Sequence, residues 1–142
     1  MRRRSFLAAA ATTSILALLP LAATAQDTKK MRVVVQVSEA DPARWNLVLN
    51  NVRNLQQDLG AANVSIEVVA YGPGIGILKL DAVSNSRVSE AIKDGVNVAA
   101  CENTMRNQKL VHADMHPGVS YVPSGVVEIV RRQQEGWAYL RP

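Results

Sequence analysis

Cys101 is the only cysteine of the 142-residue chain, and its position suits a reactive thiol. It follows an apolar run, residues 96–100, that predicts a buried strand, and it precedes residues 102–110, which predict a helix. A side chain at the carboxyl end of a parallel strand faces the crevice where open α/β sheets bind ligands. Amides at the start of the helix would favour the thiolate over the thiol. The residues leave three roles open: a nucleophile, a sulfur carrier or an inert core residue.

Polar and charged residues follow Cys101 within the predicted helix. Asn103 and Thr104 can hydrogen-bond an anionic sulfur group, although such residues near a helix start are as often caps. The cation of Arg106 would favour the thiolate, whereas the adjacent carboxylate of Glu102 would raise the pKa of the thiol. We therefore expect these four residues to line the site.

Gly72, Gly74 and Gly76 form a glycine-rich loop directly after another predicted strand, residues 64–70. Their spacing differs from the G-x-G-x-x-G dinucleotide pattern, and the Lys-Ser/Thr pair of a phosphate-binding P-loop is missing. The loop therefore matches neither nucleotide-binding pattern, and we predict no nucleotide cofactor. We expect the three glycines to shape the wall of the crevice beside Cys101.

His112 and His116 are the only two histidines, and Asp114 lies between them. Together with Cys101 they suggest a zinc site. The Pro-Gly pair after His116 argues against a regular helix, so the spacing of four does not place both imidazoles on one face. We predict no metal site and no other cofactor. Two roles remain open for a histidine, a base near Cys101 or an ordinary surface position.

The first 25 residues predict an export signal. Three arginines, Arg2–Arg4, precede an apolar stretch over residues 8–23, and Ala23-Thr24-Ala25 supplies the small residues that signal peptidase needs, so we expect cleavage after Ala25. The arginines before Ser-Phe-Leu resemble a bacterial twin-arginine signal, with general secretion as the other route. The apolar stretch is short for a membrane-spanning helix, which argues against an uncleaved membrane anchor. The expected location is the periplasm.

Removal of the signal changes the electrostatics. Three of the 16 Lys and Arg residues lie in it and all 12 Asp and Glu residues follow it, so the mature net charge is +1. No basic stripe with interleaved aromatic residues remains, and we predict no nucleic-acid partner. The rest comprises a polar leader, residues 26–30, and one domain, residues 31–142.

Strands and helices alternate along that domain. The predicted strands cover residues 31–37, 64–70, 96–100, 119–122 and 137–140. Asp41 caps an amphipathic helix that ends at Gly60, and the last predicted helix, residues 126–134, places Val126, Ile129 and Val130 on one side. This order predicts an α/β fold with a mostly parallel five-stranded sheet covered on both faces.

Residues 31–142 resemble the DsrE/DsrF-like family of small α/β proteins linked to sulfur metabolism. The likeness is carried by residues 100–105 (ACENTM), 122–128 (VPSGVVE) and 134–139 (QEGWAY), together with the element order. The resemblance implies a three-layer α/β/α sandwich that assembles as a dimer, trimer or hexamer. In the best-understood members, a cysteine at the position of Cys101 accepts sulfane sulfur and passes it on as a persulfide.

The leading expectation is therefore an exported sulfur carrier or sulfurtransferase that uses the Cys101 thiolate. Its partners would be a sulfur donor, and a protein or small thiol as acceptor. Two alternatives remain open. The first is a non-catalytic oligomeric binding or assembly module in which Cys101 is buried and inert. The second is a redox sensor, because a lone exported cysteine has no intramolecular partner and can form an intersubunit disulfide or a sulfenic acid.

Overall fold

The computed structural model describes residues 29–142, so the predicted signal and residues 26–28 of the leader lie outside the described residues. Five strands form one sheet in the order β4-β3-β2-β1-β5, and every neighbouring pair is parallel. The strands are β1 (Met31–Val37), β2 (Val64–Ala70), β3 (Asn97–Cys101), β4 (Ser120–Val122) and β5 (Ala138–Leu140). The predicted α/β class and strand positions are confirmed.

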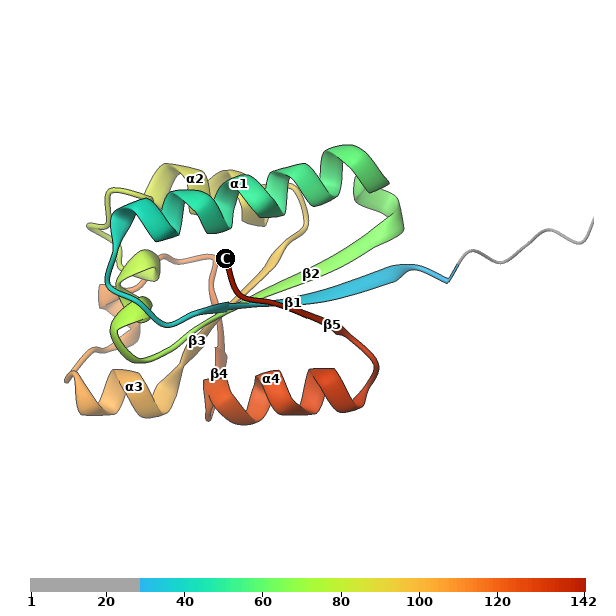
Figure 1. Cartoon of the computed structure of the whole chain (residues 1–142). Helices are drawn as coiled ribbons and strands as arrows, with labels where there is room; N and C mark the ends of the chain where they lie inside the picture. The colour runs from blue at the N-terminus through green and yellow to red at the C-terminus, as the bar shows by residue number, and fades with distance from the viewer. Residues whose placement is uncertain (1–28) are drawn as a thin grey trace, which may run out of the picture.

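Helices cover both faces of the sheet (Figure 1). One face carries α1 (Pro42–Leu59) and α2 (Asn85–Lys93), and the other carries α3 (Glu102–Asn107) and α4 (Gly125–Gln134). Short 3-10 helices are η1 (Ala61–Asn63), η2 (Gly72–Leu78) and η3 (His112–Asp114). The three-layer sandwich is therefore confirmed. No helix among residues 29–142 has both the length and the apolar content to cross a membrane.

The larger part of the core lies between the sheet and the α1/α2 layer. Asp41 accepts a hydrogen bond from the Ala43 amide at 2.9 Å and caps α1, as predicted. Trp45, Val48 and Val52 then recur at helical spacing and pack against the sheet. Beneath α4 the buried core is smaller and comprises Val34, Val69, Ala99 and Ile129.

Two local predictions were wrong. The glycine-rich segment after β2 is a 3-10 helix, η2, because Pro73 and successive turns satisfy its backbone locally. In α4 the predicted buried face is incorrect, since Val126 and Val130 are exposed while Glu128 and Ile129 are buried. The inward position of Glu128 is explained by Arg132 of the same helix, which pairs with both Glu128 and Glu67 of β2, and the valine pattern did not reveal this.

Parallel pairing brings the carboxyl ends of the central strands to one edge. Val37 is opposite Ala70, Ala70 is opposite Ala100, and Cys101 is opposite Val122. The segments that leave β2, β3 and β4 therefore meet at this edge. It is the edge at which the sequence places the candidate thiol.

Candidate functional site

Cys101 is the last residue of β3 and also the N-cap of α3. Its strand partner, Val122, ends β4 and leads through two residues to Gly125, the first residue of α4. The starts of two helices thus converge on one sulfur atom. Because the amides of a first helical turn have no intrahelical acceptor, both helices offer free donors at this point.

The amide of Gly125 donates a hydrogen bond to Sγ of Cys101 at 3.2 Å. Only a glycine allows this approach without displacement. A Cβ at position 125 would lie 2.9 Å from Cβ of Tyr71 and 3.3 Å from Cβ of Cys101. The backbone of α4 can therefore act directly on the sulfur.

Thr104 connects the thiol to the start of η2. Its hydroxyl accepts a hydrogen bond from the Gly72 amide at 2.8 Å, which leaves the hydroxyl proton free to point at Cys101. Gln108 donates to the Gly72 carbonyl at 3.1 Å. Both polar groups of the Gly72 peptide are thus held by α3 or the residue that follows it.

The surroundings of Cys101 shift the pKa of its thiol. Burial of the thiol raises its pKa. The Thr104 hydroxyl and the backbone amides of Gly125 and Thr104 stabilise the anion by hydrogen bonding and lower the pKa. The hydrogen bonds outweigh burial, so the pKa of Cys101 lies below its ordinary value.

The expectation of a thiol that faces an open crevice is not met in this conformation. Cys101 is 4% exposed and counts as a buried free cysteine. The physical reason is the close contact of Gly125 with both Tyr71 and Cys101, which lets the α4 start close over the sulfur. The thiol is buried among hydrogen-bond donors rather than in an apolar interior.

The other residues predicted on α3 lie around the thiol in different ways. The Asn103 amide donates to the Pro123 carbonyl at 3.2 Å, while its side chain accepts a hydrogen bond from Arg106. Glu102 lies 3.8 Å from Nε2 of His112, whose ring stacks on Tyr121 at 3.7 Å. These charged side chains are at least partly exposed and form the rim of the site, whereas Thr104 lies inside it.

Of the three predicted glycines, only Gly72 contacts the Cys101 helix. A Cβ at Gly74 would lie 2.3 Å from the Val37 carbonyl oxygen, so this glycine permits close packing against the end of β1. A Cβ at Gly76 would lie 2.9 Å from the indole of Trp45. Gly74 and Gly76 therefore seat η2 on the scaffold, and their contacts point away from Cys101.

The two histidines lie in separate environments. His116 is buried, its Nε2 lies 2.6 Å from the Ser89 hydroxyl, and its Nδ1 accepts a hydrogen bond from the Gly118 amide. An accepting Nδ1 places the proton of the neutral ring on Nε2, so His116 donates to Ser89 and cannot activate it as a base. Within residues 29–142, no group of three or more His, Cys, Asp or Glu side chains is arranged to hold a metal ion.

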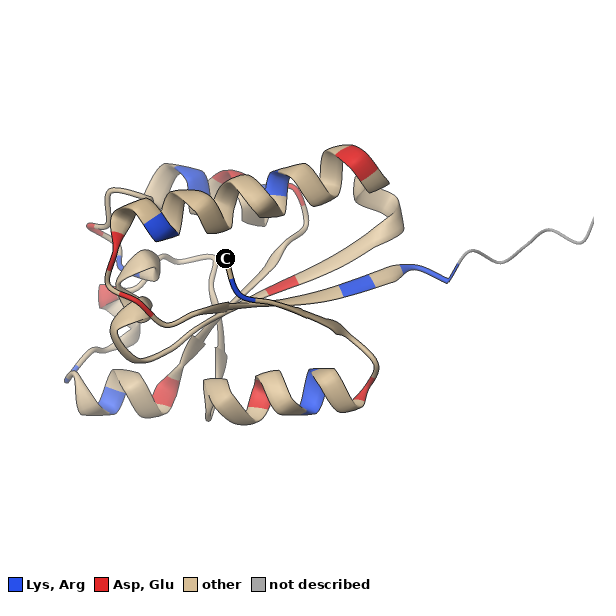
Figure 2. Cartoon of the chain, in the orientation of Figure 1, with Lys and Arg blue, Asp and Glu red and all other residues tan. Residues whose placement is uncertain are grey.

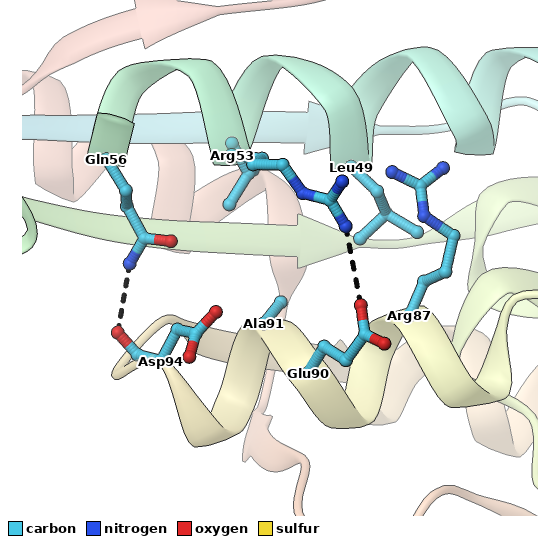
Figure 3. A pocket seen from close by; sticks show the side chains of 8 residues that line it. Leu49, Arg53, Gln56, Arg87, Glu90, Ala91 and Asp94 are labelled. Atoms are coloured by element: carbon cyan, nitrogen blue, oxygen red, sulfur yellow. Dashed lines mark hydrogen bonds and ion pairs between the residues drawn. The ribbon is translucent and has the colours of Figure 1, made fainter. Parts of the chain in front are cut away.

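A small surface cavity lies between α1 and α2 (Figure 3). It measures about 30 Å³ and is crossed by an ion pair between Arg53 and Glu90 at 3.4 Å. Gln56 donates to the Asp94 carbonyl at 2.9 Å across the same seam. The cavity lies on the face of the sheet opposite to α3 and α4, and its contacts join two helices rather than form a reactive site.

Sequence reasoning missed Gly125 and Tyr71 as site residues. Gly125 lies within the VPSGVVE segment that carries part of the family resemblance, which was the available signal. Tyr71 follows directly after β2, and its amide donates to the Val37 carbonyl at 3.1 Å. Its place beside Gly125 depends on strand order, which connects residues far apart in sequence.

Comparison with known proteins gives a family and a fold. The DsrE/DsrF-like family matches residues 29–142. The protein of unknown function MTH1491 from Methanobacterium thermoautotrophicum is 47% identical, with a TM-score of 0.76 over 79% of this chain and 99% of that one.

Two further solved structures resemble the fold at 12% identity. The ychN protein from E. coli has a TM-score of 0.65 over 79% of this chain and 99% of its own. BT1422 from Bacteroides thetaiotaomicron, of unknown function, has a TM-score of 0.63 over 78% of this chain and 94% of its own. No curated protein matches the sequence.

Proposed function

Because the chain belongs to the DsrE/DsrF-like family, a family of sulfur-relay type, we propose that it carries sulfur as a persulfide on Cys101. The Cys101 thiolate attacks the outer sulfur of a sulfane donor. A new S–S bond forms at Sγ, the donor S–S bond breaks, and the donor leaves as a thiolate. A thiolate of an acceptor then attacks the outer sulfur and releases Cys101 as the thiolate.

The convergence of donors on Sγ carries this proposal. A thiolate, rather than a thiol, is the nucleophile in both steps and the leaving group in the second. The Gly125 amide at 3.2 Å and the Thr104 hydroxyl stabilise that anion whenever Cys101 carries no additional sulfur atom. An ordinary buried cysteine needs no such set of donors.

Intact mass measurement tests the proposal. The protein without its first 25 residues is incubated with inorganic polysulfide and weighed under non-reducing conditions. The expected result is a gain of one sulfur atom, absent from the Cys101→Ser variant and reversed by a small thiol acceptor. A mass that does not change, in a protein shown to be folded, contradicts the carrier.

The burial of Cys101 favours a second candidate, a non-catalytic binding or assembly module with an inert thiol. In that case the native protein would resist a small alkylating reagent until it is denatured. The hydrogen-bond donors around Sγ favour the carrier, for which the α4 start must move aside during transfer.

We also propose that the protein self-associates, as a dimer, trimer or hexamer. The support is an exposed apolar stripe on α4 formed by Val126, Val127 and Val130. Light scattering of the native protein measures the assembly. The Val127→Lys variant should shift the mass toward the monomer, whereas unchanged mass would place any interface elsewhere.

Export to the periplasm is proposed from the arginine-rich start and the Ala23-Thr24-Ala25 motif alone. Cell fractionation with an intact and an Arg3→Lys, Arg4→Lys start tests it. Processed protein should appear in the periplasm only with the intact arginines if the twin-arginine route is used. Processing that is unaffected by the change indicates general secretion.

A further inference from the structure

Two half-buried side chains, Tyr71 and Val122, flank Cys101 on the face of the sheet that α4 covers. Cys101 pairs with Val122 of β4 on one side. On the other side, the last β2/β3 pair joins the residues directly before Tyr71 and Cys101, so these two side chains are neighbours. Access to the sulfur therefore depends on Tyr71, on Val122 and on the start of α4 above them.

The start of α4 packs directly on Tyr71. The three atoms nearest to a Cβ at Gly125 are Cβ and Cδ1 of Tyr71, at 2.9 and 3.2 Å, and Cβ of Cys101, at 3.3 Å. Gly125 therefore lies over the side chains of Tyr71 and Cys101 together. Because the same glycine donates to Sγ, the tyrosine ring that it packs on also supports the hydrogen bond to the sulfur.

The backbone of Tyr71 is fixed by hydrogen bonds at both of its polar groups. Its amide donates to the Val37 carbonyl at 3.1 Å, and its carbonyl accepts from the Gly74 amide at 3.1 Å. The next residue, Gly72, is held by Thr104 through its amide. Tyr71 can therefore move away from Gly125 only by rotation of its side chain, which a half-exposed residue can make without a change in the backbone.

The phenol of Tyr71 lies among polar side chains at the end of β1. Burial, followed by the neighbouring Tyr139, raises the pKa of Tyr71. Arg141 and a hydrogen bond with Ser38 oppose this effect, and the pKa of the phenol still lies above its ordinary value. Ser38 also accepts from Nε2 of Gln36 at 3.1 Å, and Oε1 of Gln36 accepts from the Tyr139 hydroxyl at 2.5 Å. These contacts hold the ring in the position that packs on Gly125.

An ion pair lies on the outer side of the phenol. Arg141 donates to Glu39 at 2.5 Å, and both charges are close enough to affect the pKa of Tyr71. Figure 2 shows a basic segment directly before the C-terminus and an acidic one in the connection that leaves β1. The polar side chains around the phenol are all at least partly exposed. Water can therefore replace their contacts when the ring turns outward.

We propose that the Tyr71 side chain controls the accessibility of Cys101 by holding the start of α4 over the sulfur. While the ring packs against Gly125, the sulfur is covered and hydrogen-bonded. When the ring rotates toward solvent, the start of α4 loses this contact and moves aside, and a sulfur donor or acceptor reaches Sγ. Tyr71 is thus a positioning residue, and the inference rests on the function proposed for Cys101.

Alkylation of the native mature protein by iodoacetamide, followed from pH 5 to 10, tests this role. Tyr71→Ala should raise the rate constant of the thiolate about tenfold, because the packing of the ring on Gly125 is lost. The midpoint of the pH profile should also move to higher pH, since the Gly125 amide leaves the sulfur more often. Tyr71→Phe keeps the ring on Gly125 and should restore both values toward those of the unmodified protein.

Val122→Ala is the matched control. It removes a half-buried side chain on the other side of Cys101 and keeps the contact between Tyr71 and Gly125. Its rate constant and midpoint should change much less than those of Tyr71→Ala. Repeating the measurement in dilute urea separates local opening from global unfolding, because only global unfolding makes the rate constant rise steeply with urea. We expect no steep rise for Tyr71→Ala.

An unchanged rate constant or an unchanged midpoint in Tyr71→Ala overturns the inference. A steep urea dependence, or an equal acceleration by Val122→Ala, also overturns it. The sulfur-uptake measurement separates this outcome from that of the carrier. Uptake by a protein whose alkylation does not respond to Tyr71→Ala refutes the role of Tyr71 alone. Absence of uptake, together with the expected response to Tyr71→Ala, refutes the carrier alone.

Discussion

The Gly125 amide lies 3.2 Å from Sγ of Cys101, although 24 residues separate them in the sequence. The distance joins the first residue of one helix to the N-cap of another across the β3/β4 pair. Because the donor is a backbone amide, its position is set by the fold rather than by a side-chain rotamer. The ionisation of Cys101 thus depends on the seating of α4.

Substitution of Gly125 should raise the pKa of Cys101. In Gly125→Ala the new methyl group would meet Tyr71 at 2.9 Å, so the α4 start must shift and the hydrogen bond to Sγ weakens. Thiolate absorbance as a function of pH measures the change. Ser124→Ala is the matched control, since the Ser124 side chain makes no capping hydrogen bond. An unchanged pKa in Gly125→Ala would show that this amide does not stabilise the anion.

Loss of the Thr104 hydroxyl should raise the pKa of Cys101 and destabilise the fold. Thr104→Val keeps the volume but leaves the Gly72 amide without its acceptor, at a cost of about 1–3 kcal/mol in the free energy of unfolding. The pKa of Cys101 should rise in the same variant. Thr104→Ser should restore both properties. Equal stability of Thr104→Val and the unmodified protein in urea would refute this role.

The free energy of unfolding of Glu67→Gln, relative to that of the unmodified protein, should increase as pH rises. The folded-state pKa of about 7 exceeds the ordinary 4.5, so between these values the folded protein binds more protons than the unfolded chain. The contribution of Glu67 to stability is therefore present below 4.5 and is lost as pH rises through 7. The stability difference between Glu67→Gln and the parent should grow by roughly 3 kcal/mol over this window.

Urea unfolding at pH 5, 6, 7 and 8 measures that difference. Glu135→Gln, which removes the more exposed carboxylate paired with Arg131, is the matched control. A difference for Glu67→Gln that stays constant across the four pH values would mean that Glu67 is already ionised at pH 5.

Gly74 and Gly72 should respond differently to alanine. In Gly74→Ala the methyl group would lie 2.3 Å from the Val37 carbonyl oxygen, and backbone must move, at about 3 kcal/mol or more. A Cβ added at Gly72 would have no atom within 4 Å, so the cost is only the strain of an alanine at φ +53°, about 1 kcal/mol. Chemical denaturation of both variants tests the contrast. Equal losses would contradict the assigned contacts.

The sequence was sufficient for the strands and for the position of Cys101 between strand and helix. Those features depend on local patterns such as the β-branched run of β1 and the Asp41 cap of α1. It was insufficient for α4, where the buried face depends on an ion pair between Arg132 and Glu67 of the distant strand β2. The hydrogen bond from the Gly125 amide to Cys101 and the contact of Gly125 with Tyr71 depend on strand order and helix packing, which residue types alone do not encode.

The proposed carrier role requires that the sulfur of Cys101 react in the folded protein. The second-order rate constant for alkylation of the native mature protein by iodoacetamide, measured from pH 5 to 10, gives both its access and its ionisation. We predict reaction without denaturant and a midpoint below the roughly 8.5 of a free thiol. A thiol that reacts only after unfolding, or with a midpoint at or above that value, would contradict the carrier role.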